Sequence, residues 1–171
     1  NAASSREIIA DGERRGQRQS ENDTKTLPIR TGYEDADMQR TLSVQMDRYA
    51  AKLWLRQYHP TMDGGLWYGA SELPNSRPKQ VVQKLEVRYQ GRVVPIMRGA
   101  YADLSEVNQI LFFKNRRGEM VLRIEGGDAA DSYRVYLVFR GGELIRRRVE
   151  SGEFPRNFYE ETHYVNIPVK D

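Results

Sequence analysis

Apolar and polar residues alternate with a period of two over residues 118–149, GEMVLRIEGGDAADSYRVYLVFRGGELIRRRV. Three alternating runs are separated by the turn-forming segments Gly-Gly-Asp-Ala-Ala-Asp and Gly-Gly. Alternation bounded by glycine and aspartate is typical of antiparallel strands that turn one face toward a hydrophobic core. The stretch therefore predicts an antiparallel meander around which the rest of the chain folds.

The length of the second turn decides which residues of its flanking strands face each other. A two-residue loop at 141–142 would place Arg146 and Arg148 on the face that should be buried, where unpaired charge is costly. A three-residue loop at 141–143 shifts the register by one residue and turns the following strand over.

The second register brings together residues of matching character: Phe139 with Ile145, Val135 with Val149, and Arg134 with Glu150. We expect this register, with a glycine-dependent bulge at the turn. Phe139 and Ile145 then share the buried face with Leu137, and Tyr136 lies on the outer, more exposed face. Arg147 alone is badly placed.

Further segments with strand-type residues lie on both sides of this meander. They are residues 81–89, 92–97, 107–113 and 162–169. Pro95 lacks an amide donor, so its strand should lie at an edge or a bulge. About seven short strands with turns roughly every 8–12 residues predict a mainly β fold, an antiparallel β-sandwich or barrel-like domain over residues 80–171.

Residues 34–79 fit two interpretations. Apolar side chains at steps of three and four favour a helix over 36–50, although Leu42, Val44 and Met46 also alternate as in a strand. We expect an N-terminal helix there, appended to the β domain, with 52–58 as a possible strand. Residues 61–79 should form a loop that aromatic packing holds against the core.

Residues 1–33 are polar and short of aromatic side chains, so they bury too little apolar area to offset the entropy lost on ordering. They predict a mobile leader that orders against a partner. Four apolar residues in it could still dock locally: Ile8, Ile9, Leu27 and Ile29. The start Asn-Ala-Ala-Ser-Ser resembles a trimmed one, which favours an extracytoplasmic bacterial protein, periplasmic or secreted.

Composition excludes several classes of chemistry. The chain of 171 residues is long enough for one domain, and its lack of cysteine rules out disulfides, thiol catalysis and cysteine-ligated metals. The net charge of +3 argues against a nucleic-acid partner. No apolar run approaches the roughly 18–20 residues of a transmembrane helix.

Two groups of residues resemble metal or acid–base sites. The segment 125–132 holds Glu125, Asp128, Asp131 and Ser132, and such oxygen-rich loops can bind calcium. Its glycines and aspartates are better explained by a turn, so we expect no metal there. His59 and His163 would form a site with nearby carboxylates only if distant parts of the chain met.

Two further groups resemble binding surfaces. Arg146, Arg147 and Arg148, together with Arg140, Arg123 and Tyr136, could present a cationic strip. Consecutive strand residues point to opposite faces, so cross-strand pairing with glutamates is the better explanation. Trp54, Trp67 and Tyr68 could stack on sugars but are more often part of a core. The triplet 22–24 fits a glycosylation acceptor, a pattern that is common by chance.

The sequence contains no nucleophile elbow, phosphate loop, dinucleotide fingerprint or zinc-protease motif. It therefore predicts no catalytic residue, cofactor or metal. The hypothesis that follows is a non-enzymatic module that binds an unknown protein or polysaccharide, or has a structural role. The alternative is a carbohydrate-active or other carboxylate-dependent hydrolase, which would need two carboxylates with unusual pKa values in one cleft.

Overall fold

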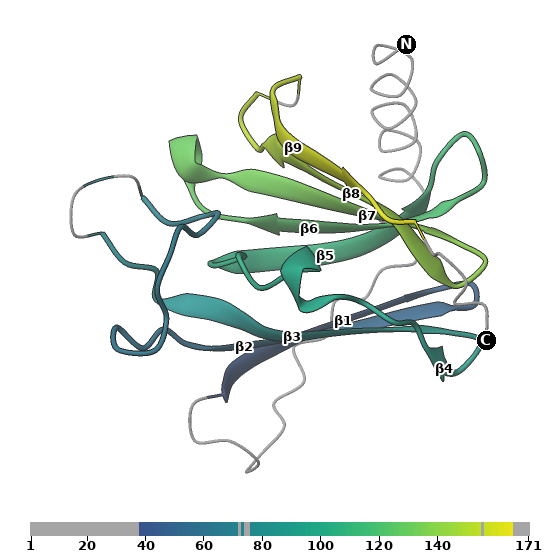
Figure 1. The fold of residues 1–171 in the computed structure, drawn as a ribbon, viewed down its shortest axis with the longest axis horizontal. Helices are drawn as coiled ribbons and strands as arrows, with labels where there is room; N and C mark the ends of the chain where they lie inside the picture. The colour runs from purple at the N-terminus through teal and green to yellow at the C-terminus, as the bar shows by residue number, and fades with distance from the viewer. Residues whose placement is uncertain (1–37, 72, 74–75, 155, 166–171) are drawn as a thin grey trace.

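The computed structural model describes residues 38–71, 73, 76–154 and 156–165, which form two antiparallel sheets (Figure 1). The four-stranded sheet contains, in order, β1 (Met38–Met46), β2 (Tyr49–Gln57), β3 (Gln80–Tyr89) and β4 (Arg92–Val93). The five-stranded sheet contains β5 (Val107–Lys114), β6 (Met120–Gly126), β7 (Tyr133–Arg140), β8 (Glu143–Ser151) and β9 (Phe158–His163). The prediction of a mainly β, antiparallel fold is confirmed. The leader predicted at 1–33 lies outside the described residues.

The helix predicted over 36–50 is wrong, because this segment forms most of a β-hairpin. Leu42 and Val44 on β1 are buried, and alternate residues of β2 are buried from Tyr49 onward. Asp47, with φ of 52°, helps to close the two-residue turn between the strands. The spacing of three and four residues between apolar side chains arises because inward-facing residues of β1 and β2 happen to be separated by these numbers of residues.

Three other element boundaries differ from the sequence prediction. The strand expected at 92–97 is only two residues long, and it ends before Pro95. The last strand begins at Phe158, earlier than the predicted 162, and residues 166–169 lie outside the described part of the chain. β3 begins at Gln80, one residue before the predicted start at 81, and pairs with β2 along its length.

One hydrophobic cluster contains side chains from both sheets. Tyr49 of β2 lies 6.0 Å from the ring of Phe112 on β5 and 5.9 Å from the ring of Phe139 on β7. The edge strands β1 and β5 lie side by side, and Arg40 of β1 donates a hydrogen bond to the carbonyl of Val107. The two sheets therefore fold around a shared core.

The pairing of β7 with β8 combines both registers considered for the sequence. Val135 faces Val149 and Arg134 faces Glu150, as predicted. A bulge after Val138 then shifts the pairing, so Phe139 faces Leu144 and not Ile145. The turn consists of the two residues 141–142. The bulge leaves one residue of β8 without a partner on β7, so this short turn is compatible with the pairing of Val135 and Val149.

Arg147 points into the space between the sheets, and partners from a distant loop compensate its charge. Its Nη2 lies 2.7 Å from Oδ1 and 2.9 Å from Oδ2 of Asp103, and its Nε donates to the carbonyl of Ala100 at 3.1 Å. Glu160 on β9 forms a further ion pair with it. The residue that looked misplaced in the sequence thus ties β8 and β9 to the 98–105 segment.

The five-stranded sheet is buried on both faces. A second hydrophobic cluster lies on the outer face, away from the shared core, and contains Leu111, Phe113, Val121, Tyr136 and Val138, with Ile145 packed against it. Tyr136, which the sequence led us to place on an exposed face, is 0% exposed, as is Phe139 on the inner face. Among the described residues, no helix is long and apolar enough to cross a membrane.

Because both aromatic rings are fully buried, Phe139→Ala and Tyr136→Ala should each lower the free energy of unfolding by about 3–5 kcal/mol. Val93→Ala, at an edge position that is 54% exposed, is the control and should change it by less than about 0.5 kcal/mol. Urea denaturation measures all three. A cost for Tyr136→Ala close to that of the control would contradict burial of the outer face.

Candidate functional site

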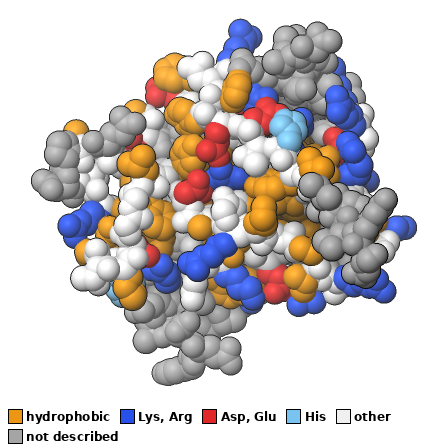
Figure 2. Space-filling model, in the orientation of Figure 1, with side chains coloured by type: hydrophobic (Ala, Val, Ile, Leu, Met, Phe, Trp, Pro, Cys, Tyr) orange, Lys and Arg blue, Asp and Glu red, His pale blue; other side chains and the backbone are white. Residues whose placement is uncertain are grey.

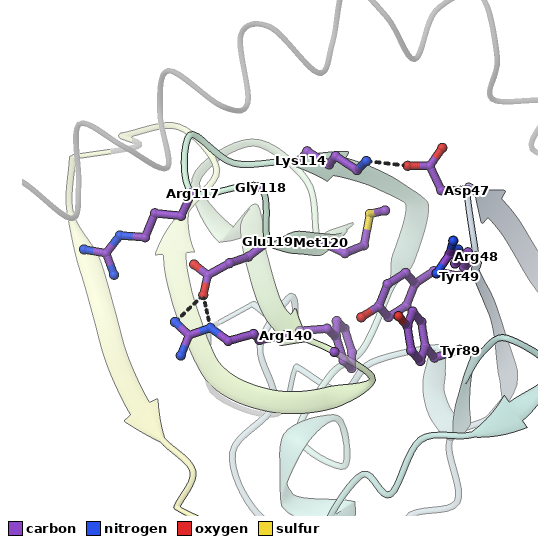
Figure 3. A pocket seen from close by; sticks show the side chains of 12 residues that line it. Asp47, Arg48, Tyr49, Tyr89, Lys114, Arg117, Gly118, Glu119, Met120 and Arg140 are labelled. Carbon is purple, nitrogen blue, oxygen red and sulfur yellow. Dashed lines mark hydrogen bonds and ion pairs between the residues drawn. The ribbon is translucent and has the colours of Figure 1, made fainter.

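A cleft with a volume of about 790 Å³ opens at one end of the two sheets (Figure 3). Three turns surround it: the β1–β2 turn at 47–48, the β5–β6 turn at 115–119 and the β7–β8 turn at 141–142. The antiparallel meanders bring these turns to the same end, since each turn connects a strand that runs toward this end to a strand that runs away from it. The cleft is therefore a direct product of the topology.

Aromatic side chains form the inner wall of this end cleft. The rings of Tyr49 and Tyr89 lie 4.7 Å apart, tilted by 40°, and Phe139 and Met120 continue the apolar surface. Burial raises the pKa of the Tyr49 hydroxyl, which accepts a hydrogen bond of 3.0 Å from the amide of Gly142. Tyr49 thus stays neutral at physiological pH and anchors the β7–β8 turn.

Two ion pairs cross the rim of the end cleft. Nζ of Lys114 lies 2.7 Å from Oδ2 of Asp47 and links the two sheets. Nη2 of Arg140 lies 2.5 Å from Oε2 of Glu119, whose other oxygen accepts a hydrogen bond from Asn115 at 3.0 Å. Both carboxylates of the lining are therefore already paired with a cation.

Burial acts to raise the pKa of Glu119, but the hydrogen bonds from Asn115 and Arg140 outweigh it and leave the pKa lowered. Asp63 and Glu86 also have lowered pKa values, because Arg56 and Arg88 respectively donate hydrogen bonds to them. These carboxylates are held ionised, which is the opposite of what a general acid requires.

Arg48 and Arg117 complete the rim without an ion pair to any described carboxylate. With Lys114 and Arg140 they make four cations against the two carboxylates of the lining. The end cleft thus combines an aromatic wall with an excess of positive charge at its mouth. Such a site suits an anionic group attached to an apolar or aromatic body.

The structure separates the residues of the possible calcium loop. Oε1 of Glu125 lies 2.8 Å from Nε of Arg134 on the neighbouring strand, and so Glu125 pairs across the sheet. Asp128 and Asp131 lie at the short helical turn η2 (Ala129–Asp131) and line a smaller cleft of about 580 Å³ at the other end of the molecule. No group of three or more His, Asp or Glu residues within the described ranges could hold a metal ion.

The histidines do not form a common site. His59 follows β2, and its amide donates to Asp63 at 2.8 Å. His163 ends β9, pairs with Arg146 across the sheet and contacts Oε1 of Glu161 at 3.0 Å. β2 begins at the end cleft and runs away from it, so His59, which follows β2, lies at the far end of the molecule. His163 faces Arg146 near the start of β8 and therefore lies toward the end cleft.

The residues of the possible cationic strip do not lie on one face of the sheet. Arg147 faces inward while Arg146 and Arg148 face outward, where Glu161 and Glu150 pair with them, as the alternation predicted. The Nζ atoms of Lys52 and Lys84 each lie over the ring of Trp54, 4.8 Å from its centre. In Figure 2, acidic and basic side chains are interspersed with hydrophobic ones on the face in view.

Trp67 and Tyr68 lie apart from Trp54, in the loop between β2 and β3. Trp67 packs edge-on against Tyr58, and Tyr68 stacks on Tyr159 with ring centres 5.9 Å apart. The aromatic residues thus do not make one continuous flat platform within the described part of the chain.

No residue was assigned to the end cleft from the sequence, where Arg140 was considered only as part of a possible cationic strip. Tyr49, Tyr89 and Phe139 look like ordinary strand residues, and Arg48 and Arg117 look like ordinary turn residues. The signal that could have found them is positional, because alternate turns of a meander meet at one end. That signal depended on the β1–β2 hairpin, which the helix prediction concealed.

Comparisons with known proteins identify no relative. No family model matches the chain, and neither the curated proteins nor the solved structures contain a match. The function must therefore be argued from the geometry alone.

Because Gly142 has no side chain, the β7–β8 turn can lie directly against the ring of Tyr89 in the end cleft. It has φ of +80°, and an added Cβ would lie 2.6 Å from the ring of Tyr89, whereas one at Gly141, with φ of +56°, would meet nothing within 4 Å. Gly142→Ala should therefore cost about 1–3 kcal/mol more than Gly141→Ala, the matched control that carries only the backbone strain. Equal costs in thermal unfolding would show that Tyr89 is not held against the turn.

The lowered pKa of Glu119 predicts a pH-dependent contribution to stability. A carboxyl whose pKa is lower in the folded state stabilises the fold above its unfolded value, near the reference of 4.5, and this contribution is lost as pH falls through the folded value. Glu119→Gln should thus destabilise the protein at pH 7, with a deficit that shrinks below pH about 4.5. The control Glu153→Gln, at an exposed position, should show no such trend, and a deficit for Glu119→Gln that is constant from pH 7 to pH 3 would refute the pairing.

Proposed function

We propose that this protein is a non-enzymatic binding module and that the end cleft takes an amphipathic organic anion. The ligand has an apolar or aromatic body and a carboxylate or a similar anionic group. The observation that carries this proposal is the aromatic wall of Tyr49, Tyr89 and Phe139 beneath a rim on which Arg48 and Arg117 have no ion pair to a described carboxylate.

The size and lining of the end cleft support this function. Its volume of about 790 Å³ lies within the range of roughly 300–1,000 Å³ that small-molecule sites usually have. Apolar walls with a few fixed polar groups are the common pattern of such sites, since the walls supply affinity and the polar groups supply orientation. We further propose that the two sheets form a β-sandwich, barrel-like where β1 lies beside β5, with the end cleft as its open end.

The alternative, a carboxylate-dependent hydrolase, has less support. Such an enzyme needs a protonated carboxyl as general acid, usually with a raised pKa, close to a second carboxylate. Asp47 and Glu119 line the end cleft, but each is paired with a cation and the pKa of Glu119 is lowered. The bacterial, extracytoplasmic setting and a protein or polysaccharide partner that carries the anionic group stay predictions from the sequence.

The proposal predicts that 2-naphthoate binds more tightly than its neutral analogue 2-naphthalenemethanol. Both have the apolar body, and only the first has the anionic group. Replacing these two arginines, in Arg48→Gln with Arg117→Gln, should weaken 2-naphthoate binding about 2- to 30-fold, since each exposed charge pair contributes about 0.2–1 kcal/mol. Affinity for the neutral analogue should not change. Isothermal titration calorimetry at low and high salt measures the affinity of each ligand.

The matched control removes the same charge at the other end of the molecule, where Arg77 and Lys79 line the smaller cleft. Arg77→Gln with Lys79→Gln should leave 2-naphthoate binding unchanged. Equal binding of the charged and neutral ligands, or an equal loss in both double variants, would sink the proposal for the end cleft.

A further inference from the structure

The smaller cleft, of about 580 Å³, is lined by two loops that belong to different sheets. The β2–β3 loop contributes residues 69–71 and 77–79, and the β6–β7 loop contributes residues 127, 128 and 131. Arg40 of β1 and Val107 of β5 also line it, and Nη2 of Arg40 donates a hydrogen bond to the carbonyl of Val107. The smaller cleft therefore lies where the two sheets meet.

Glu106 holds both loops of the smaller cleft in place. Its Oε1 accepts hydrogen bonds from the amides of Lys79 at 2.5 Å and Gln80 at 2.8 Å. Its carbonyl accepts a hydrogen bond of 3.1 Å from the amide of Gly127 on the other loop. Its φ of 50° is unusual for a residue other than glycine, and such a conformation persists where the surrounding structure fixes it. The smaller cleft is therefore formed before any ligand binds.

The two loops carry charges of opposite sign. The β2–β3 loop supplies Arg77 and Lys79, and the β6–β7 loop supplies Asp128 and Asp131. Arg77, Lys79 and Asp128 are exposed, and Asp131 is partly exposed. Within the described part of the chain, none of these four side chains forms an ion pair. Unpaired charges of both signs thus line one cleft.

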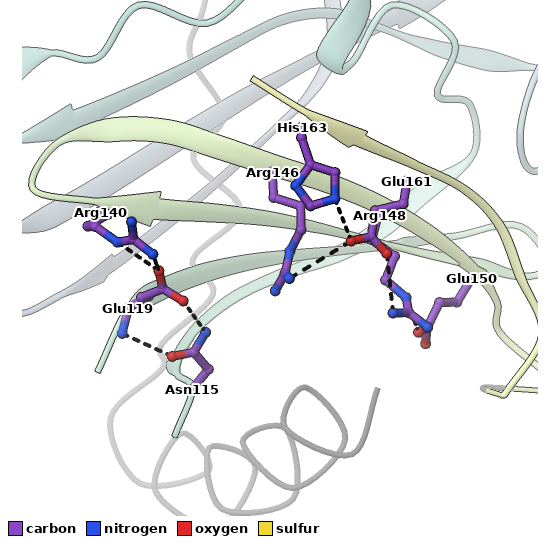
Figure 4. Close-up of polar contacts among 8 residues, drawn as sticks. All are labelled: Asn115, Glu119, Arg140, Arg146, Arg148, Glu150, Glu161 and His163. Atoms are coloured by element: carbon purple, nitrogen blue, oxygen red, sulfur yellow. Dashed lines mark hydrogen bonds and ion pairs between the residues drawn. The ribbon is translucent and has the colours of Figure 1, made fainter. Parts of the chain in front are cut away.

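Charges on the outer face of the five-stranded sheet are arranged differently (Figure 4). Nη2 of Arg140 lies 2.5 Å from Oε2 of Glu119, and Nε of Arg148 lies 2.7 Å from Oε1 of Glu150. Nη1 of Arg148 also lies 3.5 Å from Oε2 of Glu161. These opposite charges neutralise each other directly. In the smaller cleft, separate loops hold the opposite charges apart, so a ligand that carries both signs can bridge them.

The carboxylates of the β6–β7 loop are not used to form its turn. Asp128 precedes η2, a position from which an aspartate side chain often caps a helical turn, but its side chain makes no capping hydrogen bond. Its carbonyl instead accepts a hydrogen bond of 2.9 Å from the amide of Asp131. The hydroxyl of Ser132 donates to the carbonyl of Ala129 at 2.6 Å. The turn explains the backbone of this loop, and it leaves the charge of the two aspartates without a structural role.

We propose that the smaller cleft binds an amino acid or a short peptide with free termini. The carboxylate of the ligand lies against Arg77 and Lys79, and its ammonium group lies against Asp128 and Asp131. A ligand with only one of these charges is bound less well, since it gains one set of charge pairs and meets like charge on the other loop.

The remaining lining of the smaller cleft suits the body of such a ligand. Its uncharged polar side chains, which can form hydrogen bonds with peptide groups, are those of Ser71, Gln80 and Asn108. The volume of about 580 Å³ lies within the range of roughly 300–1,000 Å³ that is usual for small-molecule sites. This site is separate from the end cleft and does not depend on the ligand proposed there.

Three dipeptide probes test the proposal by titration of the full-length, ¹⁵N-labelled protein. Glycylglycine has both charges, N-acetylglycylglycine has only the carboxylate, and glycylglycinamide has only the ammonium group. Glycylglycine should shift the amide signals of Lys79, Asn108 and Asp128 in a saturable way. Each blocked probe should bind about 2- to 30-fold more weakly, the effect of losing two exposed charge pairs.

Two double variants assign each end of the ligand to one loop. Arg77→Gln with Lys79→Gln should weaken glycylglycine binding about 2- to 30-fold and should not weaken binding of glycylglycinamide, which has no carboxylate. Asp128→Asn with Asp131→Asn should weaken glycylglycine binding equally and should not weaken binding of N-acetylglycylglycine. None of these side chains forms an ion pair with a described residue, so both variants should keep the fold.

The matched control is Arg48→Gln with Arg117→Gln in the end cleft, which should leave glycylglycine binding unchanged. Equal affinity for the three probes would overturn the proposal, as would an equal loss of all three probes in either double variant of the smaller cleft. Saturable shifts centred on Tyr89 in the end cleft, or no saturable shift at any amide with glycylglycine, would overturn it as well.

Discussion

The pairing of β7 with β8 determines where three consecutive arginines point, and much of the structure depends on it. Strand geometry sends Arg147 inward and its neighbours outward. Inward charge is tolerated because Asp103 and Glu160 meet Arg147 there. The bulge after Val138 then permits the tight glycine turn, which brings Gly142 against Tyr49 and Tyr89 in the end cleft. One register thus organises the core, the outer face and the candidate site.

Within the described part of the chain, both faces of the five-stranded sheet are largely buried. Its inner face contributes to the shared core, and its outer face carries the second hydrophobic cluster and paired charges. The end cleft and the smaller cleft lie at opposite ends of the sheets, among the turns. The end cleft has an aromatic wall and more cations than carboxylates. The lining of the smaller cleft has three of each, namely Arg40, Arg77, Lys79, Glu106, Asp128 and Asp131.

The sequence allowed the fold class and the central meander to be predicted, because alternation is a local property of each strand. It allowed most β7–β8 pairs to be predicted, because only one register matches Val135 with Val149 and Arg134 with Glu150. The β1–β2 hairpin was missed because inward residues of two strands mimicked a helical stripe. The burial of Tyr136 and the partners of Arg147 were out of reach, since they depend on contacts between segments far apart in the sequence. For the same reason the end cleft could not be assembled from its separate turns.

Mapping a bound ligand by NMR tests whether the end cleft is the ligand site. Two-dimensional amide spectra of the ¹⁵N-labelled protein would be recorded during titration with 2-naphthoate. If the ligand binds there, the largest chemical-shift changes should occur at Arg48, Tyr49, Tyr89, Arg117 and Gly142, and they should saturate as the ligand is added. Changes centred on Gln80, Glu106 and Asp128 at the opposite end, or no saturable change at any amide, would contradict it.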